Sequence, residues 1–580
     1  MKKLTVFALA AALAAASFAS CGTYTDTDSS SAGSSSEASA SESSAESGEA
    51  SSEETSGSTA DEFTIIATQP NTLNMIQSTS NLDNYAFYLT QEMLFRPYDG
   101  VYQPEVVDTW EVDDTNTVFT YHLKETTWSD GTPITAEDFA YYLTAQLDPN
   151  NGSANAAFLI DTYGFLNAEA YNNGECDVSE VGIKALDDYT LELTLETPNA
   201  DFDGTNIKVY PLDADFVAEQ GEALGGTVDN YMSSGPYVLS EWVYDSYLTY
   251  TKNDKWLNSD SQYPVETVKM IQATDANTST SMFEGGEADA ILTVGNDYLD
   301  ILSDYLVEDV FSGTKGVQFN TYGQGDEAKA ALLSNKNFRM AMSYALDREA
   351  IVAAVDRSGI AINRYNYGDM AGKEVDSKFA DDFSVETVPM NGDADKAKEY
   401  LQAALDELGY ASVDELPALS YLTFENDSYR LMAETLVDQW KQVLGLTNIT
   451  IDLKPIPDAI QSMMSYQYDL YYTSLSGGET PSTFAKYWIT GGAVNDVTGS
   501  GMSLFSNEEY DSLIKSTSTE FDRAKRMEDY AKAEQIFIDE GPLIPIETGV
   551  NYAAVADYVD GFVYNSFDDA IELDHLSVNK

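Results

Sequence analysis

Residues 22–60 hold almost nothing that a folded core could bury. These 39 residues are nearly all Ser, Ala, Gly, Thr and Glu, with eight acidic residues, no Lys or Arg, and one aromatic residue, Tyr24. Burying so little apolar surface does not offset the conformational entropy that a chain loses when it is ordered. The segment is therefore predicted to be a disordered, acidic, Ser-rich tether, and the fold has to be built from residues 61–580.

A secretory signal precedes the tether. Lys2 and Lys3 are followed by a mainly apolar run from Leu4 to Ala19, whereas a membrane-spanning helix needs about 20 residues. A basic start and a short apolar run are typical of a signal peptide, which is removed from the mature protein.

The end of this signal, Phe18-Ala-Ser-Cys21, resembles a bacterial lipobox. The resemblance implies cleavage after Ser20 and lipidation of Cys21. Residues 1–20 are then a lipoprotein signal peptide, and residues 21–60 are the lipidated Cys21 with its tether. The alternative is an ordinary secretory signal followed by an incidental cysteine.

The folded part of the chain is strongly acidic. The whole sequence has 97 Asp and Glu against 30 Lys and Arg, and residues 61–580 keep 89 acidic and 28 basic residues, a net charge of −61. This charge argues against nucleic acid as a partner, because phosphates are bound through Lys and Arg, and no nucleic acid is expected. It also argues against docking on anionic lipid through a basic patch.

The sequence offers few residues suited to catalysis. The two histidines, His122 and His575, cannot form the pair that a metalloprotease carries four residues apart on one helix, and no G-x-S-x-G motif occurs. Cys176 has no base beside it in the sequence that would activate a thiol. The chain is therefore expected to be neither an enzyme nor a holder of a cofactor or a metal.

Hydrophobic periodicity indicates a mixed α/β body. Glu62–Thr68 is rich in β-forming residues, and Tyr237–Lys252 has the pattern of a hairpin. Thr135–Asp138 is a capping box that opens a helix. Apolar spacing predicts one helix over Phe338–Val355 and another over Arg523–Glu540, closed by a glycine.

Several sequence blocks occur in the order found in one known family. They are Trp128-Ser-Asp-Gly-Thr-Pro133, Ser234-Gly-Pro-Tyr-Val238, Gln318-Phe-Asn-Thr321, Asp347-Arg-Glu-Ala-Ile351 and Pro481-Ser-Thr-Phe484. Together they make the chain resemble the solute-binding proteins of bacterial peptide ABC importers, the extracellular solute-binding protein family 5. The resemblance extends over the whole body from residue 61 onward.

The resemblance implies a two-lobed, periplasmic-binding-protein-like α/β fold with a hinge and an extra subdomain inserted in the first lobe. The predicted units are lobe one over 61–105, 209–315 and 533–580, the inserted subdomain over 106–208, and lobe two over 316–532. Ligand is expected in the cleft between the lobes, which close about the hinge.

The implied function is that of an extracytoplasmic substrate-binding subunit of an ABC importer. It would be a monomer anchored by lipid to the cell membrane, on the surface of a Gram-positive cell, where it captures oligopeptides and delivers them to the permease subunits. Two alternatives stay open: the same scaffold binding a non-peptide solute, such as an oligosaccharide or a metal chelate, and a peptide-sensing receptor.

A buried peptide amino terminus needs a carboxylate partner, because an unpaired buried charge is very costly. The family supplies an Asp shortly after a Trp. Here Leu475 stands at the Trp position, and Gly478 or Glu479 stands at the Asp position. The resemblance therefore makes this segment, with Ser476, a candidate ligand contact, and Glu479 the candidate partner of the amino group.

Other candidate ligand contacts are polar residues expected at the carboxyl ends of strands, which face the cleft in open α/β lobes. They are Ser78, Ser80, Asn81 and Asn84 after the first strand, Asn320 beside a crossing segment, and Phe424 and Asn426 in lobe two. For each of them singly, the alternative is a role in loop capping or turn formation.

Overall fold

The computed structural model describes residues 61–580 except 99–100, 259–263, 274, 311–312, 357, 369, 375–376, 479, 493–494, 496–502, 504 and 566–569. The signal peptide, Cys21 and the tether lie outside the described residues.

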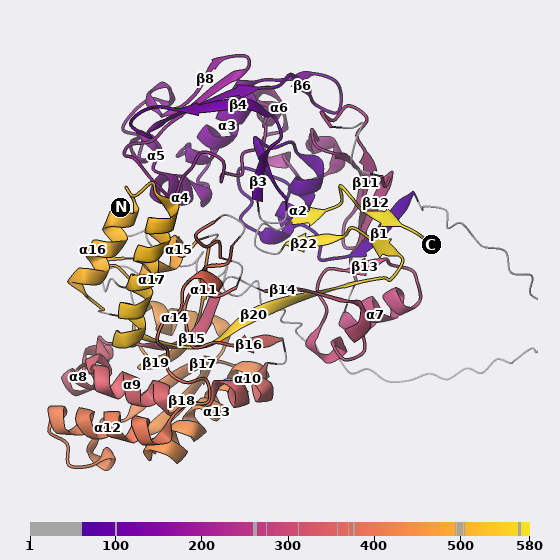
Figure 1. Cartoon of the computed structure of the whole chain (residues 1–580). Coiled ribbons are helices and arrows are strands. Elements are labelled where there is room, and N and C mark those ends of the chain that lie inside the picture. The colour runs from indigo at the N-terminus through magenta and orange to yellow at the C-terminus, as the bar shows by residue number, and fades with distance from the viewer. Residues whose placement is uncertain are drawn as a thin grey trace, which may run out of the picture.

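A long mixed sheet extends through the molecule (Figure 1). Within the described residues it has twelve strands, in the order β10-β11-β12-β1-β13-β20-β15-β19-β17-β18, and β14 and β16 also pair with β20. The strands are β1 (Glu62–Ile66), β10 (Tyr237–Val243), β11 (Tyr247–Lys252), β12 (Thr267–Ile271), β13 (Ala290–Ile291), β14 (Leu306–Val310), β15 (Gly313–Phe319), β16 (Gly359–Ala361), β17 (Leu419–Phe424), β18 (Ile449–Lys454), β19 (Leu470–Ser476) and β20 (Leu543–Val555).

Strand β20 belongs to two hydrophobic cores. In its first half Ile544 pairs with Val317 of β15 and is buried in one core. In its second half Ala554 pairs with Leu306 of β14 and is buried in the other. The chain thus passes between two lobes along β14 and β15 and again along β20.

The first lobe is built from both ends of the described chain, because its core contains Phe63 and Val578. It includes helix α2 (Asn81–Thr90), α6 (Ala214–Gln220) and α7 (Ala276–Glu284). Short strand pairs complete it: β2 (Phe95–Tyr98) with β3 (Val101–Pro104), β21 (Val559–Asp560) with β24 (Ser577–Val578), and β22 (Val563–Asn565) with β23 (Ala570–Glu572). A further pair, β6 (Thr126–Thr127) with β7 (Pro133–Ile134), lies within the range predicted for the inserted subdomain.

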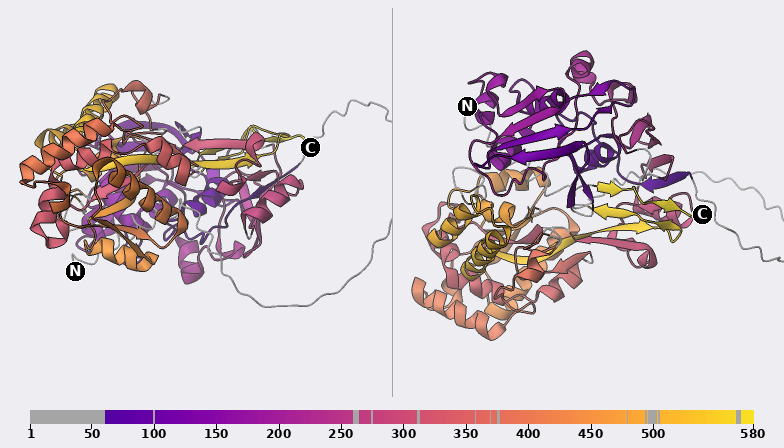
Figure 2. Two further views of the ribbon diagram at one scale, coloured as in Figure 1. Left: turned by 90° about the horizontal axis from the view of Figure 1, so that it is seen from below. Right: turned by 45° about the horizontal axis from the view of Figure 1, so that its top comes forward.

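A separate sheet and its helices stand on this lobe (Figure 2, right). The sheet has the order β4-β5-β9-β8, and the elements are β4 (Val107–Val112), β5 (Val118–Leu123), β8 (Ile183–Asp187), β9 (Thr190–Thr194), α3 (Ala136–Leu147), α4 (Asn155–Phe158), α5 (Ala168–Asn172) and the π-helical turn η1 (Leu159–Tyr163). The predicted capping box opens α3, since Thr135 N donates to Asp138 Oδ2 at 2.7 Å.

The second lobe buries Val317, Phe319 and Trp440 beneath helices α9, α10, α12 and α13. A further cluster contains Phe484, Tyr510 and Phe537 from α15, α16 and α17. The helices of this lobe are α8 (Glu327–Ser334), α9 (Lys336–Tyr344), α10 (Arg348–Val355), α11 (Phe379–Asp382), α12 (Ala394–Leu408), α13 (Asp427–Leu444), α14 (Ile456–Met464), α15 (Ser482–Tyr487), α16 (Glu508–Thr517) and α17 (Arg523–Glu540).

The single helix predicted over Phe338–Val355 is wrong in one respect, because the chain breaks it into α9 and α10. Asp347 caps α10 by accepting a hydrogen bond from Ala350 N at 3.0 Å. Arg348 is fully buried and its Nε donates to the Pro545 carbonyl of β20 at 2.7 Å. This distant partner fixes Arg348 at a helix start, which periodicity alone cannot reveal.

The residue ranges of the lobes stay predictions. One predicted boundary between lobes falls inside a helix. The predicted boundary at 533 divides α17, whose Tyr530 and Phe537 on either side are buried in the same cluster as Leu543. We propose that the last passage between the lobes lies within β20 instead.

Gly225 shapes the loop that leads to α2. Its φ is +70°, and a Cβ there would lie 2.1 Å from Asn74 N and 2.2 Å from the Leu73 carbonyl carbon. The Gly225 carbonyl also accepts a hydrogen bond from Leu73 N at 3.0 Å. The position therefore needs both a left-handed backbone and the absence of a side chain.

Gly225→Ala is expected to lower the free energy of unfolding by about 3 kcal/mol or more, since backbone strain and a backbone collision add together. The matched control is Gly409→Ala. Gly409 also has a positive φ, +79°, but nothing lies within 4 Å of its Cβ position, so about 1 kcal/mol is expected. Urea unfolding followed by tryptophan fluorescence measures both, and equal losses would contradict the packing argument.

Candidate ligand-binding site

A cavity of about 310 Å³ lies in the first lobe, between the loop before α2 and the inserted elements. Its apolar walls are mostly aromatic rings: Phe87, Tyr102, Tyr142, Phe158, Tyr163 and Tyr210. Rigid rings of this kind offer large contact areas at low entropy cost.

The polar part of the lining consists of hydroxyls, amides and one cation. Asn84, Gln146, Asn155 and Asn206 contribute amides, and Lys208 is the charged side chain. Within the described lining there is no Asp or Glu, although the chain has 97 of them. The described lining thus offers no carboxylate to pair with an ammonium, and it is better suited to a neutral group.

Three of the residues predicted after the first strand line this cavity: Ser78, Ser80 and Asn84. Ser80 also caps α2, because its Oγ accepts a hydrogen bond from Leu82 N at 3.2 Å. Asn81 begins α2, and its side chain lies outside the described part of the structure. Ser80 therefore both caps the helix and lines the cavity.

Ser78 connects the loop to the inserted subdomain. Its Oγ donates to Asp83 Oδ2 at 2.7 Å, and its carbonyl accepts from Asn155 Nδ2 at 2.9 Å. Asp83 is buried, and this burial raises the pKa of its carboxyl despite hydrogen bonds from Ser78 and from the backbone of Asn71 and Thr72. The carboxylate holds the loop in place and is not part of the cavity lining.

Asn320, predicted as a ligand contact, is fully buried in the second lobe. Its Nδ2 donates to the carbonyls of Tyr466 at 3.0 Å and Tyr468 at 2.7 Å, and its Oδ1 accepts from Tyr322 N at 3.2 Å. These contacts fasten the chain after β15 to the start of β19, a structural role that uses the whole amide.

Phe424 and Asn426 also have local roles in the structure. Phe424 is buried in a small cluster with Tyr468 and Tyr471. Asn426 caps α13, its Oδ1 accepting from Ser428 N at 2.9 Å. At this strand end, which was predicted to face ligand, Phe424 therefore packs in a core and Asn426 caps a helix.

The segment aligned with the family's amino-group site is only partly described. Leu475 is buried among the aromatic residues of the α15–α17 cluster. Gly478 is buried too, and a Cβ there would lie 2.4 Å from Thr483 Oγ1, so a larger residue would require the Thr483 side chain to move. Ser476 closes β19, but its side chain, like the whole of Glu479, lies outside the described residues.

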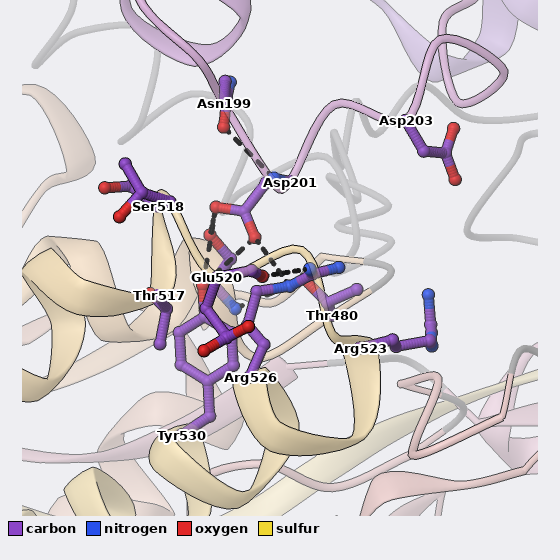
Figure 3. Close-up of polar contacts among 12 residues, drawn as sticks. Asn199, Asp201, Asp203, Thr480, Thr517, Ser518, Glu520, Arg523, Arg526 and Tyr530 are labelled. Carbon is purple, nitrogen blue, oxygen red and sulfur yellow. Dashed lines mark hydrogen bonds and ion pairs between the residues drawn. The ribbon is translucent and has the colours of Figure 1, made fainter. Parts of the chain in front are cut away.

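One residue at the lobe junction was not predicted. Asp201, on the loop after β9, contacts helices α15 and α17 of the second lobe (Figure 3). Nothing in the sequence separates it from the other acidic residues, since Ser482 and Tyr530, its partners, are 281 and 329 positions away.

The fold is similar to that of a two-lobed periplasmic binding protein. The murein tripeptide-binding protein MppA, in its unliganded open form, superposes with a TM-score of 0.73 at 21% identity, over 90% of this chain and 99% of that one. This likeness confirms the predicted fold class.

The family model described as "Bacterial extracellular solute-binding proteins, family 5 Middle" matches residues 101–496. The chain therefore belongs to the bacterial extracellular solute-binding proteins of family 5, as predicted, and this is a family of binding proteins rather than of enzymes.

Two curated relatives from Bacillus subtilis (strain 168) are similar over most of their length. The oligopeptide-binding protein OppA is 28% identical over 492 residues, which is 83% of this chain and 86% of OppA. The dipeptide-binding protein DppE is 28% identical over 451 residues, 77% of this chain and 78% of DppE.

Two further findings concern the described residues alone. None of their helices has the length and apolar character to span a bilayer. They also contain no group of three or more His, Cys, Asp or Glu arranged to hold a metal ion.

Asn320→Ala should lower the free energy of unfolding by roughly 2 kcal/mol, because it leaves buried carbonyls without donors. The control is Asn391→Ala, an exposed amide with a hydrogen bond to Glu349, for which a change within about 0.5 kcal/mol is expected. Urea unfolding measures both variants. A stable Asn320→Ala variant would contradict the structural role and return the residue to the set of ligand contacts.

Proposed function

We propose that this protein is the lipid-anchored, extracytoplasmic substrate-binding subunit of an ABC importer, capturing oligopeptides between its lobes and delivering them to the permease. The observation that carries the proposal is the similarity to OppA and DppE over most of the chain. The lipobox-like sequence before Cys21 and the tether that follows it support a membrane anchor.

The architecture is suited to capture by closure. Two lobes with separate cores are joined along β14, β15 and β20, and such lobes can rotate about the joining strands around a ligand. An extended peptide needs partners for its main-chain amides, and the amides and hydroxyls of the cavity supply groups of that kind.

The charge of the cavity indicates which part of a peptide it would take. Among the described residues of the lining there is no Asp or Glu, which favours a neutral side chain over an ammonium group. The amino terminus would then lie elsewhere, and Glu479 remains the candidate for it. Gly478 at the family's Asp position favours, as a second candidate function, the binding of a solute without a free amino group.

The proposal is tested by native mass spectrometry of the full chain purified from cells, followed by release of bound molecules with denaturant. A ladder of short peptide masses is the expected result. A single non-peptide mass would contradict peptide capture and favour the second candidate function.

Glu479→Ala is expected to weaken the binding of a released peptide with a free amino terminus by at least tenfold, because a buried ammonium loses its charged partner. Isothermal titration calorimetry measures the change, and an amino-acetylated copy of the peptide should respond little. The control Glu399→Ala removes a carboxylate exposed on α12, with a side chain 70% accessible. Equal affinity of wild type and Glu479→Ala would remove Glu479 from the site.

A further inference from the structure

The inserted subdomain touches the second lobe through the loop that follows β9. Ala200 N donates to the Ser518 carbonyl at 2.8 Å. Figures 1 and 2 show α15, α16 and α17 beneath the inserted elements, on the side of the molecule away from β14. The two lobes therefore meet at a second place, apart from the strands that join them.

Asp201 is at the centre of this contact (Figure 3). Its carboxylate accepts hydrogen bonds from Ser482 Oγ at 2.5 Å, Lys486 Nζ at 2.7 Å and Tyr530 OH at 3.1 Å. Arg526 Nε lies 3.8 Å away. Four groups from two helices of one lobe thus converge on a single carboxylate of the other.

The carboxylate is ionised at neutral pH. Burial by itself raises the pKa of Asp201, but the charges and hydrogen bonds of Lys486, Ser482 and Arg526 lower it by more than burial raises it. The pKa therefore lies below its ordinary value. The side chain of Asp201 is 13% accessible, and that of Lys486 is 38% accessible. The bridge therefore joins a mostly buried carboxylate to a partly accessible ammonium.

The Asp201 loop is also tied to the cavity. Asn206, a cavity residue, donates from Nδ2 to the Asp201 carbonyl at 2.8 Å and accepts from Asp203 N at 3.2 Å. At the other end of the loop, Asn199 Nδ2 donates to the Thr162 carbonyl at 2.9 Å, next to cavity residue Tyr163. Moving Asp201 therefore displaces segments that line the cavity.

We propose that Asp201 is a positioning residue for ligand capture. Its bridge to α15 and α17 holds the cavity-lining loop against the second lobe. The effect of this bridge on ligand binding rests on the function proposed above, whereas the bridge itself does not depend on any ligand.

The ligand-independent test compares Asp201→Asn with Asp203→Asn in the full chain. Asp203 is on the same loop and points away from the cluster (Figure 3). Its Oδ1 accepts from Thr205 N at 2.8 Å, a bond that an Asn can keep, so this control retains the turn and leaves the bridge intact.

Small-angle X-ray scattering and hydrogen–deuterium exchange are the readouts. Asp201→Asn is expected to increase the radius of gyration and to speed exchange in residues 199–206 by about tenfold, the loss of one charge-assisted contact. Asp203→Asn should leave both unchanged. Wild-type scattering and exchange in Asp201→Asn would overturn the proposal.

Ligand coupling is measured with a mixture of tri-, tetra- and pentaalanine as the probe. Asp201→Asn should raise the dissociation rate about tenfold with little change in the association rate, and a rate equal to that of Asp203→Asn would overturn the coupling. If the wild type does not bind the probe, peptide capture of this kind fails, while scattering and exchange still decide whether the bridge exists.

Lys486→Met serves if Asp201→Asn does not fold, since it removes one partner from a partly accessible position. It should change scattering and exchange in the same direction. Where both single variants fold, the variant carrying Asp201→Asn and Lys486→Met together should change scattering and exchange by less than the sum of the two single changes, because both substitutions act on one ion pair. Unchanged scattering and exchange in Lys486→Met, or strictly additive effects, would overturn the proposal.

Discussion

Strand β20 is the element on which the two lobes depend. Its thirteen residues, Leu543–Val555, supply core side chains to one lobe and then to the other, so the strand can be displaced from neither without opening a core. The strands joining the lobes are therefore firmly held at both ends, and relative motion has to come from the backbone between them. Rigid bodies on a short strand connection are the usual basis of hinge closure.

The junction between the lobes has a different chemistry from their interiors. Each lobe is held by buried aromatic and aliphatic side chains, whereas Asp201 meets the second lobe through charge-assisted hydrogen bonds. Apolar cores within the lobes and a charged, hydrogen-bonded junction between them thus follow from the placement of different residue types.

The sequence predicted those features that local patterns encode. The helix over Arg523–Glu540 and the capping box at Thr135 agree with the structure, because both depend on neighbouring residues. The break before Arg348 was missed, since its partner Pro545 is 197 positions away. Ser78, Ser80 and Asn84 line the cavity, whereas Asn320 and Phe424 are buried, and burial depends on tertiary packing that one sequence does not display. Contact of any of these residues with ligand stays a prediction.

The composition of the first core also bears on the order in which this chain can fold. Phe63 and Val578 share that core, so its first strand must wait for almost the last residue before the core is complete. Contacts of such sequence separation form slowly, because a very long loop has to close first. During synthesis or export the amino-terminal lobe would remain unfinished, and in need of protection from aggregation, until the carboxyl-terminal strands arrive.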